Sequence, residues 1–529
     1  MAQTLSQYLK WFALTCVVGI IAGCSKPPGL VTSPGGVTYF VDSDKGEDVF
    51  SGTDPAHAWR TLDRVNRTIF GAGDKILFKA GGRFRGQLAP HGSGKEGAGI
   101  IVDSYGEGAK PLIQAEGSYP EALLLKNQEY WEVSNLELTN TGWVHWKYRY
   151  GVRLQAIDYG TVHHLVLRNL FVHDVNGWLA KGRGEGHGIL WQNGGEVLPS
   201  RFDGLLIENC HLLRTDRNGI CGSSGNDTRN HWFPSLNVVI RGNDLEDIGG
   251  DGIKPYGCDG ALVENNRVYK AGQRCPDYSA GIWPWSCDRT VIQYNEVSFF
   301  HGTRDGQAFD SDGNCRDTVF QYNYSHDNDG GFLMMCDDGA WGAPESLGNR
   351  GTVVRYNISQ NDRSRIFHLT GPITGARIYN NVIFLGKELH QPLFLVTDYH
   401  GFPDGIYVAN NIFYAEGACR YSRGTSRHWN GTYEDAPGWG NSKNIRFEAN
   451  SYFGNHANPP EDARAVRNDP LMLHAGSGGA GFSTLGGYQL REGSPCLRAG
   501  VPVPDGARQD FWGHPAPLGA APNIGADQR

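Results

Sequence analysis

The chain has 529 residues, a formal net charge of −8 and 73 glycines. A chain of this length can bury a large core. Its mildly acidic balance argues against a nucleic-acid partner, because phosphate backbones attract basic proteins. The composition therefore excludes the basic nucleic-acid-binding classes.

The first 24 residues predict a targeting segment. Lys10 is the only charged residue in it, and an apolar run over residues 11–21 follows, too short to span a bilayer. The run ends in Ile21-Ala22-Gly23-Cys24, which resembles the bacterial lipobox, with Cys24 as the lipidated residue. The alternative is a secretory signal cleaved nearby. Residues 25–36 predict a tether, so we expect a lipid-anchored protein of the bacterial cell envelope, in the outer membrane.

Eleven cysteines are present, and nine remain when Cys16 and Cys24 of the leader are set aside. Because nine is odd, at least one of them is unpaired. No zinc-type spacing of cysteine and histidine occurs. We predict that most of these cysteines are small buried residues.

The N-terminal unit, residues 37–100, predicts a cap followed by the first coils. Residues 38–42 and 75–79 have strand patterns. Asp54 is a plausible N-cap with Pro55 at the first helical position. Apolar residues follow at helical spacing, so we expect one amphipathic helix over residues 56–69 that covers the open end of the fold.

A repeat then runs through residues 101–485. Each unit has an apolar residue three positions before an asparagine, and successive asparagines lie 23 to 40 residues apart. Periods of this size indicate a solenoid. We predict that the asparagines form an internal ladder between coils. The series is Asn135, Asn169, Asn209, Asn243, Asn266, Asn295, Asn323, Asn357, Asn381, Asn411 and Asn450.

A second pattern, Gly followed by alternating apolar residues, recurs in step with the first. No unit contains a long helix, which leaves an all-β, parallel β-helix as the predicted fold. Residues 486–529 are predicted to pack along its side. One inward column is Val152, Ile189, Ile220, Ile253 and Ile282, and the next is Leu154, Trp191, Pro255, Pro284, Phe309 and Leu333.

The coils, the predicted cap and the leader together resemble bacterial secreted right-handed β-helix proteins of the pectin-lyase-like superfamily. The resemblance covers roughly residues 36–510. It implies a carbohydrate-active protein but no single reaction, because this superfamily includes lyases, hydrolases, esterases, epimerases and tailspikes. The residues that carry it, besides the asparagines, are Tyr39-Phe40-Val41-Asp42, Ser51-Gly52-Thr53, Trp59-Arg60-Thr61-Leu62 and Gly73-Asp74.

Positions between the inward columns point outward, and several are aromatic or polar. A sugar-binding cleft needs both, apolar faces for pyranose rings and polar groups for hydroxyls. The alternative is that long loops cover the aromatic side chains. The predicted substrate-binding residues are Trp283, Trp285, Tyr256, Arg153, Gln192, His187 and His368.

Three carboxylates fall within eight residues, at Asp305, Asp310 and Asp312. On a strand, Phe309 points one way and Asp310 and Asp312 point the other. Paired carboxylates on a rigid strand suit glycoside hydrolysis. We predict Asp310 as the general acid, because apolar neighbours raise a carboxyl pKa, and Asp312 as nucleophile or base. Asp305 and Asp329 are alternative catalytic residues. The alternative without a function is that these aspartates form a solvated turn.

A further column, one position before the glycines, contains Asp251, Asp305 and Asp329. Neighbouring carboxylates are costly to ionise without a cation between them, and carboxylate oxygens suit Ca²⁺. The column predicts either a Ca²⁺ site or a series of turn-forming residues at bends.

Three functions remain open. The first is a glycoside hydrolase of the cell envelope that degrades a bacterial, plant or algal polysaccharide with paired aspartates. The second is a polysaccharide lyase, in which Lys254, Arg153, Arg365 or His368 acts on a uronate, with Ca²⁺ at the Asp column. The third is a non-catalytic glycan binder. The acidic centre favours the hydrolase. We expect a monomer with a poly- or oligosaccharide partner, no nucleic acid, no cofactor besides Ca²⁺, and membrane contact through the lipid anchor only.

Overall fold

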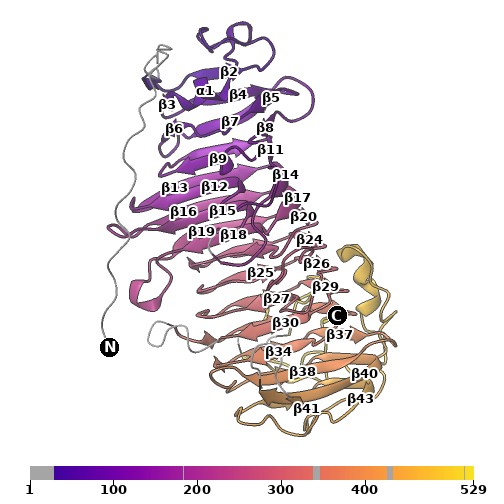
Figure 1. The fold of residues 1–529 in the computed structure, drawn as a ribbon. Helices are drawn as coiled ribbons and strands as arrows, with labels where there is room; N and C mark the ends of the chain where they lie inside the picture. The colour runs from indigo at the N-terminus through magenta and orange to yellow at the C-terminus, as the bar shows by residue number, and fades with distance from the viewer. Residues whose placement is uncertain (1–28, 183, 338–345, 426–432, 505, 518) are drawn as a thin grey trace, which may run out of the picture.

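The computed structural model describes residues 29–529 apart from 183, 338–345, 426–432, 505 and 518. Their strands stack in coils along one axis, from the N-terminal strands at one end to β43 at the other (Figure 1). The predicted leader and Cys24 lie outside the described residues. No helix in the described part of the chain is long and apolar enough to cross a membrane.

Each coil contributes strands to three faces, and strands of one face pair in parallel from coil to coil. The first face contains β2 (Thr38–Val41), β4 (Lys75–Lys79), β7 (Ile100–Tyr105), β10 (Trp131–Ser134), β13 (Thr161–Arg168), β16 (Arg201–Glu208), β19 (Ser235–Arg241), β23 (Leu262–Glu264), β25 (Val291–Gln293), β28 (Val319–Gln321), β32 (Val353–Arg355), β36 (Arg377–Tyr379), β39 (Tyr407–Ala409) and β42 (Arg446–Glu448). The second face contains β5 (Arg83–Arg85), β8 (Leu112–Gln114), β11 (Glu137–Asn140), β14 (Phe171–Asn176), β17 (His211–Asp216), β20 (Asp244–Glu246), β24 (Arg267–Tyr269), β26 (Glu296–Ser298), β29 (Tyr324–His326), β33 (Ile358–Gln360), β37 (Val382–Leu385), β40 (Ile412–Thr425) and β43 (Ser451–His456).

The third face carries the candidate site. It contains β9 (Glu121–Lys126), β12 (Tyr150–Ile157), β15 (His187–Gly194), β18 (Asn218–Ser224), β21 (Ile253–Lys254), β27 (Gln307–Ser311), β30 (Gly331–Cys336), β34 (Phe367–Thr370) and β38 (His390–Asp398). Between β21 and β27 the face continues through Ile282, which pairs with Ile253 and Phe309. The short strands β1 (Val31–Thr32), β3 (Thr68–Phe70) and β6 (His91–Gly92) form a separate sheet, as do β31 (Asn349–Arg350) and β35 (Ile373–Thr374). β22 (Cys258–Asp259) pairs with β19, and β41 (Tyr433–Glu434) pairs with β40.

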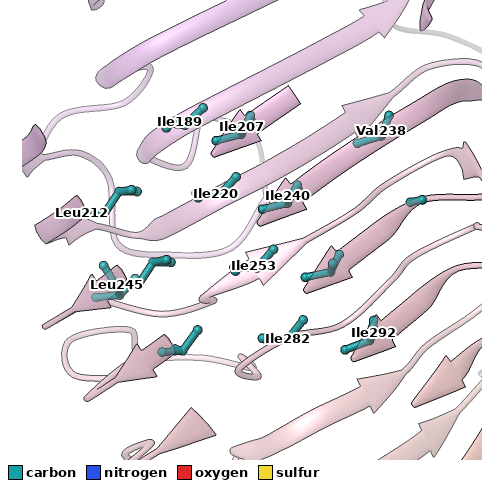
Figure 2. Close-up of a cluster of buried hydrophobic side chains, with 14 of the residues drawn as sticks. Ile189, Ile207, Leu212, Ile220, Val238, Ile240, Leu245, Ile253, Ile282 and Ile292 are labelled. Carbon is teal, nitrogen blue, oxygen red and sulfur yellow. The ribbon is translucent and has the colours of Figure 1, made fainter. Parts of the chain in front are cut away.

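The core follows the predicted first inward column. Val152, Ile189, Ile220 and Ile253 pair in that order, Ile282 follows, and all five are fully buried. Figure 2 shows four of them stacked, with side chains of the first face beside them. Since side chains on a strand alternate, this inward column sends its neighbours outward. The prediction of a parallel β-helix is confirmed.

An asparagine ladder runs inside the solenoid. The Asn266 amide oxygen accepts hydrogen bonds from the backbone N and the Nδ2 of Asn243, at 3.0 and 2.9 Å. The same pair of hydrogen bonds joins Asn323 to Asn357 of the next coil. The ladder ends where Asn450 donates to the Asp462 carboxylate. Its members are Asn243, Asn266, Asn295, Asn323, Asn357, Asn381, Asn411 and Asn450, each at most 2% exposed.

The first three predicted members do not lie in the ladder. Asn135, Asn169 and Asn209 have φ of 58°, 55° and 53° and occupy the corner one residue earlier. Asparagine tolerates this left-handed conformation better than most residues. Cys210 takes the ladder position beside Asn209 and donates its backbone N–H to Asn243.

The predicted helix over residues 56–69 is wrong. The segment instead forms a 3-10 turn, η1 (Pro55–His57), a short α1 (Leu62–Asn66) and β3. Trp59 pairs with Val41, and its side chain, 1% exposed, stacks on Tyr39 at 4.6 Å. Strand pairing and aromatic burial therefore override the helical spacing of the apolar residues.

The C-terminal residues lie beside the last coils (Figure 1). They include η3 (Phe482–Tyr488), and another 3-10 turn, η2 (Arg229–His231), lies earlier in the chain. Leu485, Tyr488 and Ile524 form a second hydrophobic cluster with Tyr324 and Phe384 of the solenoid. All nine cysteines in the described part of the chain are free, and seven are buried.

Candidate active site

Strand β27 lies two residues away from the register that the sequence alignment predicts. Phe309 pairs with Ile282, whereas the predicted column placed it beside Pro284. A turn lies directly before β27, where Asp305 and Gly306 have φ of 59° and 74°. A shift of two residues preserves the side-chain face, so Phe309 still points into the core, where it is fully buried.

Asp310 and Asp312 therefore lie on the outer side of β27, as the alternation predicts. Asp310 therefore lies beside Trp283 of the preceding coil, and Asp312 lies beside Trp285. The backbone N–H of Asp312 donates to Pro284 at 3.4 Å. Trp285, which the sequence predicted beside Asp310, is thus the neighbour of Asp312.

The three carboxylates differ in exposure. Asp310 is 2% exposed, and its Oδ1 has no hydrogen-bond partner among the described residues. Asp305 and Asp312 are half-buried and reach solvent. A ligand on the outer face can therefore touch Asp305 and Asp312, while Asp310 lies beneath the surface.

Burial and mutual repulsion keep these carboxyls protonated at unusually high pH. Burial raises the pKa of Asp305 to about 6, against the opposing charges of Lys181 and Arg365. Burial, with the charge of Asp305, raises the pKa of Asp312 to about 7. Burial, with the charges of Asp312 and Asp305, raises the pKa of Asp310 well above its usual range. The pKa values of Asp305 and Asp312 thus lie near neutral pH, which suits acid–base work.

A fourth carboxylate, Asp251, is held as an ion. Burial alone would raise its pKa, but the charges of Arg217, Lys181 and Lys254 hold the pKa at about 2. The fully buried Arg217 donates to its Oδ2 at 2.8 Å. The other oxygen accepts from the Ala280 backbone N–H at 3.0 Å. Asp251 is therefore an anchored counter-ion and not a free acid or base.

A cavity of about 580 Å³ opens on the outer side of the third face. It lies between β12, β15, β18 and β21 and Gly182, Gly184 and Glu185 of the loop that precedes β15. Burial, with the charge of Lys254, lowers the pKa of His187 well below its usual value, so the imidazole is neutral. The predicted residues that line the cavity are Arg153, His187, Gln192, Lys254 and Tyr256.

The predicted aromatic residues lie between the cavity and the carboxylates. Trp283 is 3% exposed, because Lys181 and Lys254 place their Nζ atoms 4.8 and 5.1 Å from its ring centre. Its Nε1 donates to Asp251 at 3.1 Å. Trp283 is thus covered, as the loop alternative predicts. Trp285 and Tyr256 are half-buried and stack at 6.3 Å.

The remaining predicted residues are not brought to the cavity. His368 is 7% exposed, and burial lowers its pKa well below the usual value. The Asp329 carboxylate accepts from His301 and from the Gly302 backbone N–H. Asp251, Asp305 and Asp329 do not meet as a group of metal ligands. In the described residues the one such group is Asp510, His514 and Asp527, near the C-terminus.

Sequence reasoning missed the residues that cover and organise the face. Lys181 comes from the loop before β15 and reaches over Trp283. Arg217 binds Asp251 and Asp277. Neither has a signal in the repeat, because both act across coils 34 to 102 residues away in the chain. The one indication of these residues in the sequence is a basic residue at a corner position where later coils have acidic residues.

Known proteins resemble this chain in fold and in part of its sequence. Residues 187–383 match the family model described as right handed beta helix region. A lacto-N-biosidase of Bifidobacterium longum subsp. longum is 28% identical over 613 residues, which cover 94% of this chain and 36% of that protein. The chain thus spans little more than a third of the curated relative's length.

Solved structures agree. The native GH136 lacto-N-biosidase from Eubacterium ramulus superposes with a TM-score of 0.58 and 27% identity, covering 73% of this chain and 68% of that one. A XylC structure in complex with xylose superposes with a TM-score of 0.51 and 12% identity, covering 93% and 98% of the two chains. At that identity the second likeness shows the fold alone. The chain is a right-handed parallel β-helix.

Proposed function

We propose that this chain is a glycoside hydrolase whose acting carboxylates are Asp305 and Asp312. The observation that carries the proposal is that these two groups are half-buried with raised pKa values, on the outer face two coils beyond β21 of the cavity wall. Paired carboxylates with separated environments are the usual machinery of glycoside hydrolysis. The lacto-N-biosidase relatives support the same reaction class.

The roles follow from protonation. With a pKa of about 7, Asp312 keeps its proton into the neutral range and can give it to the leaving oxygen. Asp305, with a pKa of about 6, is the first of the two to ionise and acts as nucleophile or base. Asp310, which the sequence suggested as the acid, is too buried to touch the substrate and supports its neighbours from beneath.

The test is to compare three variants. Asp312→Asn and Asp305→Asn should each lower turnover by at least ~100-fold, the usual range for an acid–base group. Lacto-N-biosides are the first substrates to test, since the relatives are named lacto-N-biosidases. Plant, algal and bacterial polysaccharides are tested next. Asp312→Asn should matter less on a nitrophenyl glycoside, whose leaving group needs little protonation.

Asp329→Asn is the matched control, because Asp329 is also half-buried on the next coil but pairs with His301. Its activity should equal that of the wild type. Reducing ends should appear without absorbance near 235 nm. Unsaturated products would instead identify a lyase, and full activity of both Asp305→Asn and Asp312→Asn would remove this pair from the mechanism.

We also propose that Cys24 carries a lipid that holds the protein at the cell envelope. The support is the sequence Ile21-Ala22-Gly23-Cys24 after an apolar run. Cys24→Ala should leave folding unchanged and release the protein into the soluble fraction. Continued membrane fractionation of Cys24→Ala would refute the anchor.

A further inference from the structure

Exposed aromatic side chains lie on two segments that flank the cavity, one that contains Tyr148 and one that pairs with Glu185. Trp143, Trp146, Tyr148 and Trp178 are 104%, 65%, 42% and 39% exposed. Among the described residues, Trp143, Trp146 and Trp178 are the only exposed tryptophans. A single exposed apolar side chain is ordinary, but a cluster marks an interaction surface. We call these four side chains the aromatic platform.

Side-chain hydrogen bonds fix the backbone of the segment that carries the aromatic platform. Arg149, 6% exposed, donates to the Val144 carbonyl at 2.6 Å and to the Asn176 side chain at 2.6 Å. Asn176 and Gly142 exchange two further hydrogen bonds, at 2.8 and 2.7 Å. The tryptophans are therefore presented by an ordered segment. Such preorganisation lowers the entropy lost on binding.

The platform and the cavity share their walls. Tyr148 belongs to both. Trp146 forms a bridge with Gly177, and Trp178 forms one with Glu185, which also lines the cavity. The Nζ of Lys147 lies 5.5 Å from the centre of the Trp178 ring and joins the two segments. A ligand leaving the cavity at this rim meets the aromatic rings directly.

We propose that the aromatic platform binds pyranose rings of a glycan chain whose neighbouring residues fill the cavity. The inference rests on the proposed function, which it extends to substrate length. Aromatic rings offer flat apolar surfaces to the C–H faces of sugars, and the shared wall makes the platform continuous with the cavity.

The distance to the carboxylates sets the length of the substrate. The platform precedes β12 and β15, and Asp312 follows β27, four to five coils away. At ~4.8 Å per coil, roughly 20 Å separate the two along the solenoid axis. A glycan that reaches both must contain several sugar residues, so the enzyme should favour chains over disaccharides.

The experiment uses the full chain with Asp312→Asn, so that binding is measured without hydrolysis. Affinity electrophoresis is run through gels that contain laminarin, xylan, pectic galactan or hyaluronan. In the gel that retards this protein, adding Trp143→Ala and Trp146→Ala should weaken binding by about tenfold or more, the usual cost of losing exposed aromatic anchors. Trp178→Ala alone should give part of that loss. Binding of the matching trisaccharide, measured by calorimetry, should not change.

Phe402→Ala is the matched control, because Phe402 is a comparably exposed aromatic residue, at 41%, in another loop. It should migrate like its parent, and all variants should keep the parent's melting temperature. Equal retardation with and without the tryptophans, or no retardation in any of the four gels, overturns the proposal. So does loss of binding to phosphatidylethanolamine–phosphatidylglycerol vesicles without loss of glycan binding, which would make the platform a membrane contact.

The two proposals can fail separately. If no glycan is hydrolysed but the tryptophans still govern retardation, the platform stands and the hydrolase assignment falls. If hydrolysis depends on Asp312 but chains and trisaccharides bind both platform variants and parent alike, the hydrolase stands and the platform falls.

Discussion

At the scale of single residues, charge placement decides what the outer face can do. Arg217 is fully buried and binds Asp251 and Asp277, so one carboxylate near the site stays ionised. Asp310 lacks such a partner and stays neutral. Two buried carboxyls on one face therefore have opposite protonation states for a visible reason.

Arg217→Met should lower the free energy of unfolding by about 3–5 kcal/mol, because removing one partner leaves a buried charge uncompensated. Arg289→Met is the control, since Arg289 is exposed and its ion pair with Asp259 contributes at most about 1 kcal/mol. Chemical denaturation of both variants measures the difference. Similar midpoints for the two variants would show that Arg217 is not needed to offset Asp251.

Asp310→Asn should raise the melting temperature at pH 8. A carboxyl whose pKa is raised in the folded state stabilises the fold fully only below its unfolded pKa, and this stability is lost as pH rises toward the folded value. Asparagine cannot ionise and avoids the loss. Relief of about 1 kcal/mol corresponds to ~2 °C or less in a chain of this size.

Thermal scans between pH 4 and pH 8 check this prediction. At pH 4, where Asp310 is protonated in the folded protein, the variant and the wild type should melt together. A variant that is less stable at pH 8 would mean that the Asp310 carboxylate is stabilised in a way that the structure does not show.

At the scale of elements, the asparagine ladder fixes one corner of most coils. Asn323 illustrates it, with its Nδ2 donating to Ile292 and Asn357 and its Oδ1 accepting from Asn295. Asn323→Ala should lower the free energy of unfolding by about 1–3 kcal/mol, because it leaves buried partners unpaired. Denaturant titration measures the loss.

Asn455→Ala serves as the control for the ladder, because Asn455 is exposed and makes one hydrogen bond, to Glu416. Its midpoint should stay near that of the wild type. If Asn323→Ala matched Asn455→Ala, the ladder would contribute shape and no stability.

Much of the arrangement of the strands and corners could be predicted from the sequence. The spacing of Asn243 to Asn450 predicted both the solenoid and the ladder. Asn135, Asn169 and Asn209 could not be separated from the others, because the same residue type suits both the ladder and the left-handed corner beside it. Local patterns in the chain give the coils, but a one-residue choice at a corner depends on the packing of adjacent coils.

At the scale of the whole molecule, the C-terminal residues close a second cluster against the solenoid. The Tyr488 hydroxyl donates to the Gln360 side chain at 2.6 Å, and Gln360 in turn donates to Gly478. Tyr488→Ala should cost about 3–5 kcal/mol, the range for truncating a large buried ring. Tyr119→Ala, at an exposed ring, is the control. Equal unfolding midpoints would show that the C-terminal cluster is dispensable.

The candidate site was only partly predictable at this scale. Asp305 and Asp312 were recognisable as a carboxylate cluster, and five predicted residues line the cavity. The burial of Trp283 was not, because part of its cover comes from Lys181, more than 100 residues earlier in the chain. A repeat predicts what each coil presents, whereas loops between strands decide what remains open.

The turn before β27 has a consequence for how such a site can change over time. Phe309 pairs with Ile282, two residues from the position that the repeat predicts, and still lies in the core. A register shift of one residue would instead turn Asp310 and Asp312 into the core and Phe309 toward water. Register shifts of even length can therefore move the carboxylates along the strand while Phe309 stays buried, whereas shifts of odd length would exchange the two faces of the strand.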